Sequence, residues 1–178
     1  MNFTLYAMSV ETFVPMLRSL SGILEKGAEH ARAKKLDESI LVNARLADDM
    51  FPLSMQVQIA CDNAKDSVAR LIGEVPPKFE NTEQTIAALK ARIEKTIDYL
   101  KSADAAALEG AVERNIVIEL PVNEMVLEMK GAQFVRDWAL PHFYFHIVTA
   151  YDILRHNGVQ IGKRDYLSHI ESYIRRKN

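Results

Sequence analysis

The sequence predicts an all-α protein, a bundle of four long helices with a small β-hairpin inserted between the third and the fourth. In four long segments, apolar residues recur at steps of three and four, which builds one apolar face on each helix. Only the stretch between the third and fourth segments changes to an alternation of period two. The chain has 178 residues, enough to bury a core, and we expect residues 1–178 to form one domain.

The first long helix is expected at residues 9–33. Ser9 is a suitable N-cap, and Pro15 lies within the first two turns, where proline disturbs a helix least. The polar connector that follows is expected to hold one short helical turn beginning at Asp37.

The second long helix is expected to follow Asp49 and to continue to about Ile72, with the Asp48-Asp49 pair as its cap. Met55 and Ile59 lie off its main apolar stripe. They indicate either a second buried face, and hence a homodimer, or a loop that covers them.

The third long helix is expected to begin at Asn81 or Thr82 and to continue to about Leu100. The segment "EVPPKFENT" before it is predicted to be a loop, because its prolines are incompatible with a regular helix. Residues 102–110 are expected to form a loose, alanine-rich end.

The predicted hairpin is "NIVIELPVNEMVLEM", with its turn at "PVNE". One face carries the apolar residues Ile116, Ile118, Leu120, Met125, Leu127 and Met129. An isolated hairpin is only marginally stable, so it has to lie against the helices or a partner chain. The fourth long helix is expected from Gly131 to Gly158, followed by a short helix at residues 164–175.

Composition excludes several classes of protein. The formal net charge of −2 gives no electrostatic reason to expect a nucleic acid or an anionic membrane as partner. No apolar run approaches the ~20 residues of a membrane helix, and no signal peptide is visible. The lone Cys61 can form no disulfide within the chain and is expected to be a buried structural thiol. We therefore expect a cytoplasmic protein.

Several catalytic motifs are missing. No glutamate stands three residues before a histidine, so the Glu-x-x-His pairs of di-iron bundles are absent. The sequence also lacks a His-Glu-x-x-His zinc helix, a Gly-rich phosphate loop and a Gly-x-Ser-x-Gly elbow. No residue can be assigned a catalytic role from the sequence.

The candidate site is in "ALPHFYFHIVTAYDILRHNG", where His142 and His146 are four residues apart. A helical wheel places His146 inside the apolar stripe and His142 at its margin, so both are expected to face the bundle interior. Pro141 collides with the carbonyl of Asp137, so the helix is expected to kink or restart directly before His142.

Two interpretations of this pair stay open. Two neutral imidazoles one turn apart can bind one divalent metal if another helix supplies a third ligand. A ligated metal requires both nitrogens within ~2.2 Å, which limits the rings to a separation of ~7 Å. Alternatively, the histidines are core residues satisfied by a carbonyl and a water.

The chain as a whole resembles the uncharacterised family called domain of unknown function 1993, in the DinB/YfiT-like superfamily of four-helix bundles. The resemblance is carried by "MFPLSMQVQIACDNAK", "FENTEQTIAALKARIEKTIDYL" and "ALPHFYFHIVTAYDILRHNGVQIGKRDYL". In DinB-like metalloproteins the last helix holds His-x-x-x-His, followed by a Leu-Arg pair. His142 and His146 match these histidines, and Leu154-Arg155 match the pair.

The resemblance implies a third ligand early in the second helix, where this chain has no histidine. Gln56, Gln58 and Asp62 are the available side chains, and of these Gln56 borders the apolar stripe while the other two point away from it. The implied metal site is therefore His142, His146 and Gln56, holding zinc or nickel. Since an amide is a poor ligand for either ion, binding is expected to be weak or absent.

Three functions follow as hypotheses. The first is an uncharacterised DinB-like protein with a weak or degenerate metal or small-molecule site. The second, which the resemblance implies, is a metal-dependent thiol S-transferase, in which the metal would lower the pKa of the thiol. The third is a non-enzymatic module that binds a ligand or a partner.

Overall fold

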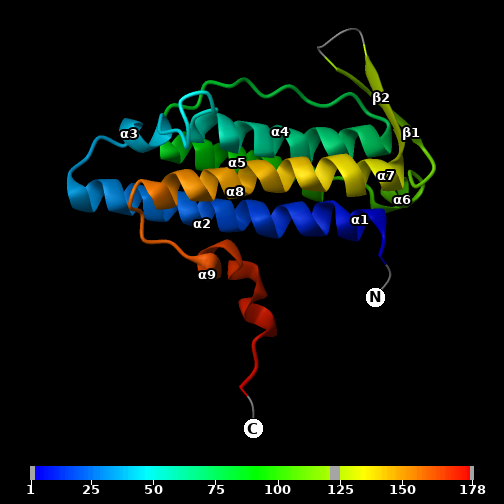
Figure 1. The fold of residues 1–178 in the computed structure, drawn as a ribbon. Coiled ribbons are helices and arrows are strands. Elements are labelled where there is room, and N and C mark those ends of the chain that lie inside the picture. Colours follow the sequence, from blue (N-terminus) through cyan, green and yellow to red (C-terminus); the bar gives the residue numbers. More distant parts are fainter. Residues whose placement is uncertain (1–2, 121–124, 177–178) are drawn as a thin grey trace.

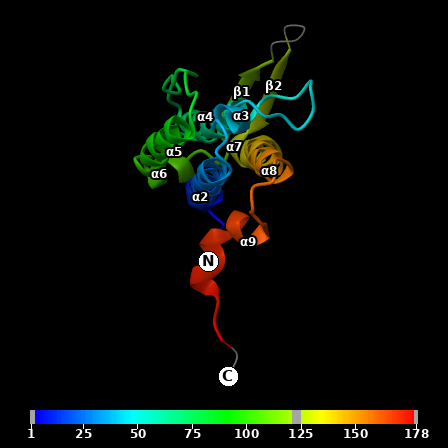
Figure 2. The ribbon, with the colours of Figure 1, turned by 90° about the vertical axis from the view of Figure 1, so that its left-hand side faces the viewer.

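The computed structural model describes residues 3–120 and 125–176. Its four long helices pack side by side around one core (Figures 1 and 2). In the end-on view of Figure 2 they follow one another around the core in the order α2, α5, α4 and α8. The four are α2 (Val10–Lys34), α4 (Leu53–Ile72), α5 (Ile86–Lys101) and α8 (Leu140–His156). The predicted all-α bundle with an inserted hairpin is confirmed.

The apolar stripes of the helices meet in the core, as their spacing predicts. Phe13 of α2 and Phe143 of α8 are both fully buried, with ring centroids 4.7 Å apart. Cys61 of α4 is also fully buried, and burial raises the pKa of its thiol to about 12. The expectation of a structural thiol is consistent with this burial, because a thiol that stays protonated is a poor nucleophile.

The helices do not simply alternate in direction. In Figure 1, α2 and α8 run one way along the bundle, and α4 and α5 run the other way. Because α4 and α5 are parallel, the connector between them, residues 74–84, returns along the length of the bundle. It contains no regular element, as its prolines predict.

A charged cluster beneath this connector fixes it to the helices. Lys65 of α4 donates to the carbonyl of Pro77 at 2.6 Å, and Arg92 of α5 donates to the carbonyl of Glu80 at 2.9 Å. Arg92 also pairs with the carboxylates of Asp62 at 2.8 Å and Glu83 at 2.9 Å. Both cations are buried, so the irregular backbone is held by buried hydrogen bonds rather than by a helix.

The cluster shifts the pKa values of its two carboxyl groups in opposite directions. Burial raises the pKa of Asp62 even though Arg92 and Lys65 oppose it. Burial also acts to raise the pKa of Glu83, but the hydrogen bonds from Arg92 and Gln58 outweigh it and leave that pKa low. The carboxylate of Glu83 is therefore the more firmly ionised of the two.

Two predicted helix starts are wrong. The helix α4 begins at Leu53 after the extended Pro52, and Asp48 and Asp49 are exposed residues that do not cap it. The helix α5 begins at Ile86, with Thr85 as a side-chain cap, rather than at Asn81 or Thr82. The later start has a physical reason, since the backbone before it is bound to Arg92.

Short elements complete the fold. Ser9 precedes α2, but its hydroxyl donates to the carbonyl of Leu5 instead of capping that helix. The expected turn near Asp37 is present as a short helix. The segment 102–110, expected to be loose, contains a short helix. The short helix expected at 164–175 is present as two shorter pieces. The short helices are α1 (Leu5–Met8), α3 (Ser39–Val42), α6 (Ala105–Glu109), α9 (Lys163–Tyr166) and a 3-10 helix (Ser168–Tyr173).

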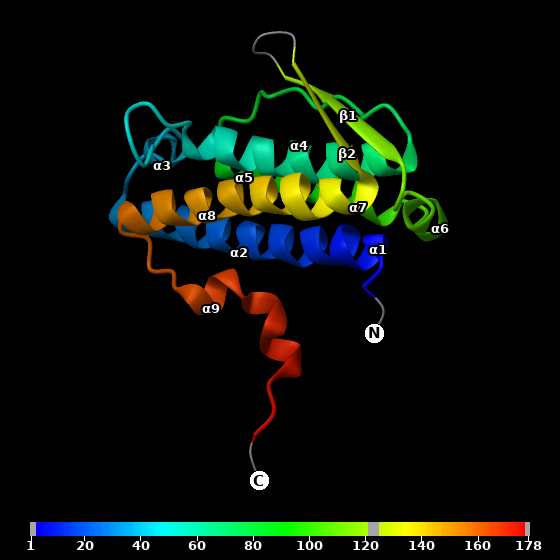
Figure 3. The ribbon, with the colours of Figure 1, turned by 45° about the vertical axis from the view of Figure 1, so that its right-hand side comes forward.

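The hairpin is present as predicted. Strand β1 (Asn115–Glu119) pairs antiparallel with β2 (Val126–Lys130), and Asn115 lies opposite Lys130. Ile116 is buried, and Ile118 and Met129 pack against the core, so the predicted apolar face is the inner one at this end, whereas Met125 near the turn is exposed. The "PVNE" turn lies outside the described residues. Figure 3 shows the hairpin rising beside α4, at the end where α7 (Gly131–Phe134) begins.

The last long helix is interrupted where the proline predicts it. A π-helical turn, Val135–Ala139, separates α7 from α8, and Leu140 donates to the carbonyl of Val135, five residues back. Pro141 lies in the first turn of α8. The wider turn accommodates a residue that has no N–H and whose ring crowds the carbonyl four residues back. Within the described residues, no helix combines the length and apolarity that crossing a membrane requires.

Candidate functional site

The two histidines lie on α8 where it packs against α4, an interface called the α4–α8 seam below. Their ring centroids are 5.0 Å apart, which satisfies the limit of ~7 Å set from the sequence. The side chain of His146 is only 6% exposed, and His142 is partly exposed. The predicted positions, one inside the apolar stripe and one at its margin, are confirmed.

Gln56 holds the inner histidine. Its Oε1 lies 2.7 Å from Nδ1 of His146, and its Nε2 donates to the carbonyl of Phe51 at 3.0 Å. Since the amide oxygen faces the ring, Nδ1 of His146 carries the proton and Nε2 presents a lone pair. Gln56 thus contacts His146 as the hydrogen-bond partner that orients it, the role typical of residues behind a metal-binding histidine.

Asn63 holds the outer histidine in the same way but with the opposite polarity. Its Nδ2 lies 3.0 Å from Nδ1 of His142 and donates to it, so the proton of His142 is on Nε2. The Oδ1 atom of Asn63 is buried and has no hydrogen-bond partner among the described residues. Sequence reasoning did not select Asn63, although it lies seven residues after Gln56 and therefore on the same helix face.

Both imidazoles are held neutral. Burial, with the neighbouring His142, lowers the pKa of His146 to about 4. Burial also lowers the pKa of His142. Aromatic edges surround the pair, with Trp138 at 5.3 Å from His142 and Phe145 at 5.2 Å from His146 between ring centroids. The seam therefore offers one N–H donor and one lone pair rather than two positive charges.

A pocket of about 220 Å³ opens beside His142, between α4, the hairpin and the start of α8. Its lining combines apolar, amide and charged side chains. It is formed by Ile59, Asp62, Asn63, Asp66, Arg70, Ile118, Trp138 and His142. Convergent polar groups beside an apolar wall are typical of small-molecule sites.

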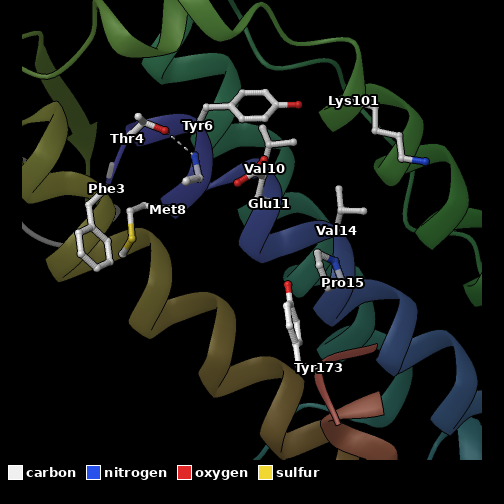
Figure 4. Close-up of a pocket in the computed structure, with 11 residues that line it drawn as sticks. Phe3, Thr4, Tyr6, Met8, Val10, Glu11, Val14, Pro15, Lys101 and Tyr173 are labelled. Carbon is white, nitrogen blue, oxygen red and sulfur yellow. Dashed lines mark hydrogen bonds between the residues drawn. The ribbon is translucent and has the colours of Figure 1, made fainter. Parts of the chain in front are cut away.

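A larger hollow, about 710 Å³, lies on the other side of the bundle and is shown in Figure 4. It lies between the N-terminal part of the chain, Lys101 of α5 and Tyr173 of the tail. Glu11 and Lys101 are its only charged lining residues among those described, and no histidine lines it. Thr4, Tyr6 and Tyr173 are its other polar side chains, but its described lining has no imidazole and no side-chain amide, whereas the seam pocket has both, so the seam is the better candidate site.

The seam offers a metal two nitrogen ligands, one from each histidine, rather than three protein ligands. Among the described residues, no three His, Cys, Asp or Glu side chains are grouped so that they could hold a metal ion. Gln58 donates to Glu83 and Asp62 accepts from Arg92, so both face the connector, as the wheel predicts, although Gln58 is buried there. Coordination by His142, His146 and Gln56 stays a prediction.

Other residues singled out in the sequence lie outside the pair. Leu154 is buried in the core, and Arg155 is exposed and donates to the carbonyl of Val159 at 3.4 Å. Met55 and Ile59 are partly buried on α4. The homodimer expected from these two residues stays a prediction.

Comparison with known proteins agrees with this architecture. The family described as domain of unknown function (DUF1993) matches residues 5–167. A crystal structure of a DinB family member protein from Shewanella denitrificans is 44% identical and covers 92% of this chain and 91% of its own, with a TM-score of 0.84. No curated protein matches the chain. The chain therefore belongs to the DUF1993 family and has the four-helix bundle of a DinB family member.

Proposed function

We propose that this protein binds a small molecule in the pocket at the α4–α8 seam, with His142 and His146 as its neutral hydrogen-bonding groups. The observation that carries the proposal is that an amide of α4 fixes each ring through Nδ1, at 2.7 Å and 3.0 Å. Each ring uses Nδ1 for the amide and keeps Nε2 for another group. A histidine that only filled the core would not need Nε2 to be free. His142 lines the pocket, and the ring of His146 lies beside it with a centroid separation of 5.0 Å, so the pair is held in place for a ligand that enters there.

The polarity of the pair selects the kind of ligand group. The Nε2–H of His142 can donate, and the Nε2 lone pair of His146 can accept. A hydroxyl, a primary amide or a water can satisfy both rings, because each of these both accepts and donates. Burial strengthens these bonds, since water competes less inside the seam.

A divalent metal fits this seam only weakly. Both rings would have to present lone pairs at Nε2, so the amide of Asn63 would have to turn and accept a hydrogen bond from Nδ1–H of His142 at its buried Oδ1. Solvent or the small molecule would complete the coordination. When bound, zinc or nickel would supply Lewis acidity. The thiol S-transferase that the resemblance implies depends on tight metal binding, for which no third protein ligand is in place among the described residues.

The location proposed with this function is the cytoplasm. Cys61 is the only cysteine of the chain and is fully buried, which suits a compartment where thiols stay reduced.

The proposal is tested with phenylacetamide as a neutral probe and with the fluorescence of Trp138, the only tryptophan of the chain. We expect saturable binding that weakens about fivefold in His142→Ala, since one hydrogen bond contributes about 1 kcal/mol. His156→Ala is the matched control, because it removes an exposed histidine from the same helix. Equal affinity of the His142→Ala and His156→Ala proteins would refute the proposal.

Metal binding is measured separately, by calorimetric titration of protein without an affinity tag with zinc or nickel chloride. We expect weak binding that is lost in His146→Gln and retained in His156→Gln. Tight binding of one ion per chain would instead favour the resident metal site that the resemblance implies.

A further inference from the structure

We infer that the ligand of the seam pocket carries a carboxylate, which binds to Arg70 at the hairpin end of the pocket. This inference rests on the function proposed above and specifies the chemistry of its ligand. It follows from the direction in which the pocket runs, from the balance of charges around it and from the side chains at its two ends.

The pocket runs along one stripe of α4. Its α4 residues Ile59, Asn63, Asp66 and Arg70 are spaced by four, three and four, so they share one face of the helix. Arg70 lies seven residues, about 10 Å, beyond Asn63. Because α8 runs antiparallel to α4, His142 lies at the Asn63 end, and Trp138 lies one turn nearer to Arg70.

Both acidic groups of the pocket lining take part in ion pairs, whereas its one basic group forms none with the residues that the structure describes. Asp62 pairs with Arg92 at 2.8 Å, and Asp66 pairs with Lys65. Arg70 forms no ion pair within the described part of the chain, and its one hydrogen bond there, to the carbonyl of Val117, is long at 3.4 Å. Asp62, Asp66 and Glu83 share the two cations Lys65 and Arg92, so the surroundings are not positive overall. Among the residues described, however, the charged lining group left without an ion pair is the guanidinium of Arg70.

The chemistry at the Arg70 end suits an acid with an apolar body. A guanidinium binds a carboxylate through two parallel N–H bonds, a geometry that an ammonium cannot reproduce. Beside it, Ile118 of the hairpin and Trp138 provide an apolar wall. One water molecule occupies about 30 Å³ in the liquid, so the pocket volume of 220 Å³ corresponds to roughly seven waters. Bonded atoms of an organic molecule are packed more closely than waters, so this volume suits a ligand of about ten non-hydrogen atoms.

A ligand amine is the competing possibility, because Asp66 also lines the pocket. Its carboxylate is already engaged by the buried ammonium of Lys65, which Asp62 and Asp66 share. An amine would have to compete with that contact, whereas a carboxylate meets an arginine without an acidic partner. The observations therefore favour the acid.

The test compares three probes of nearly equal size, phenylacetate, phenylacetamide and phenethylamine, by Trp138 fluorescence and calorimetry on the full chain. We expect phenylacetate to bind about tenfold more tightly than phenylacetamide, because the guanidinium adds a charge-assisted pair. Arg70→Gln should remove this preference, so that phenylacetate binds no more tightly than phenylacetamide. Arg70→Lys should restore only part of it. Arg136→Gln is the control, since Arg136 is exposed and paired with Asp137 near the same end.

Any result other than the expected one would contradict a specific part of the inference. Equal affinity for phenylacetate and phenylacetamide, or tightest binding of phenethylamine, would overturn the carboxylate assignment and leave the seam site in place. A preference for phenylacetate that survives Arg70→Gln would overturn the role of Arg70. No binding of any probe would overturn both the inference and the function on which it rests.

Discussion

The helix α4 carries two buried polar clusters, and they differ in whether the buried groups are charged or neutral. On the connector side, Asp62 and Lys65 join Arg92 and Glu83 in a cluster of charges, each matched by an opposite charge. On the α8 side, neutral amides hold two neutral histidines. The charged cluster uses its groups on one another and on the connector backbone, whereas the neutral one leaves a nitrogen of each ring without a protein partner among the residues described. The first arrangement stabilises a fold, and the second leaves groups for a ligand.

The largest expected effect breaks the charged cluster. Arg92→Met removes the partner of Asp62 and Glu83 while keeping much of the side-chain volume. We expect the free energy of unfolding to fall by about 3–5 kcal/mol, since breaking a buried pair leaves charges without compensation. Urea denaturation at pH 7 measures this loss.

The exposed pair Arg136–Asp137 is the control for that variant. Its side chains are 71% and 50% exposed, so Arg136→Met should change stability by less than about 1 kcal/mol. Equal losses in the two variants would show that the buried cluster does not hold the connector.

Acid is expected to destabilise the histidine pair. The folded protein keeps His146 neutral down to a pKa of about 4, while the unfolded chain takes up a proton near pH 6.5. Stability from this residue is therefore complete above pH 6.5 and is lost as the pH falls towards 4. The loss is about 2 kcal/mol, because each unit of pKa difference corresponds to about 1.4 kcal/mol and some solvent reaches the seam.

Carboxylates also titrate in this range, so the informative quantity is a difference between proteins. Unfolding of the unmodified chain and of His146→Gln should be followed from pH 7.5 to pH 4, and the curves should converge on acidification. Parallel curves would mean that the pKa of His146 is the same in the folded and the unfolded protein.

Removing the amide of Gln56 should have an intermediate effect. In Gln56→Leu, Nδ1 of the buried His146 and the carbonyl of Phe51 lose their partner, at an expected cost of about 1–3 kcal/mol. Thermal unfolding measures it. Gln56→Glu keeps an acceptor and should raise the pKa of His146, which ¹⁵N spectra of the ring can follow. If neither variant altered the ring signals, the Gln56–His146 bond would be absent in solution.

The smallest effect is expected at Asn63. Since His142 is partly exposed, water can replace the amide in Asn63→Ala, and stability should fall by less than about 1 kcal/mol. The tautomer should respond more than the stability, because Asn63 is what keeps the proton of His142 on Nε2. The ¹⁵N shifts of that ring would report a mixture of tautomers in the variant, and an unchanged single tautomer would contradict the assignment.

The sequence predicts what local periodicity controls. The apolar stripes, the hairpin and the inward direction of His142 and His146 all follow from spacing within one element. The start of α5 could not be predicted, because it depends on Arg92 holding Glu80, twelve residues away, in an extended segment.

The candidate site was predictable only in part, for the same reason. Gln56 was selected as a ligand to a metal, but its oxygen lies against the nitrogen of a ring ninety residues away. Asn63 was not selected, because its spacing of seven from Gln56 indicates the helix face but not its contact with His142, 79 residues away. Contacts across a seam between distant segments depend on packing, which spacing within one helix cannot reveal.

The π-helical turn at Val135–Ala139 also affects how this family can vary. Such a turn contains one residue more than an α-helical path would need. Because the wider turn absorbs that residue, deleting it would leave a regular α-helix whose upstream part keeps nearly its present direction. The same deletion inside α8 would instead turn everything upstream by about 100°. A change of one codon at the π-helical turn would therefore leave both the hairpin and the histidines facing α4.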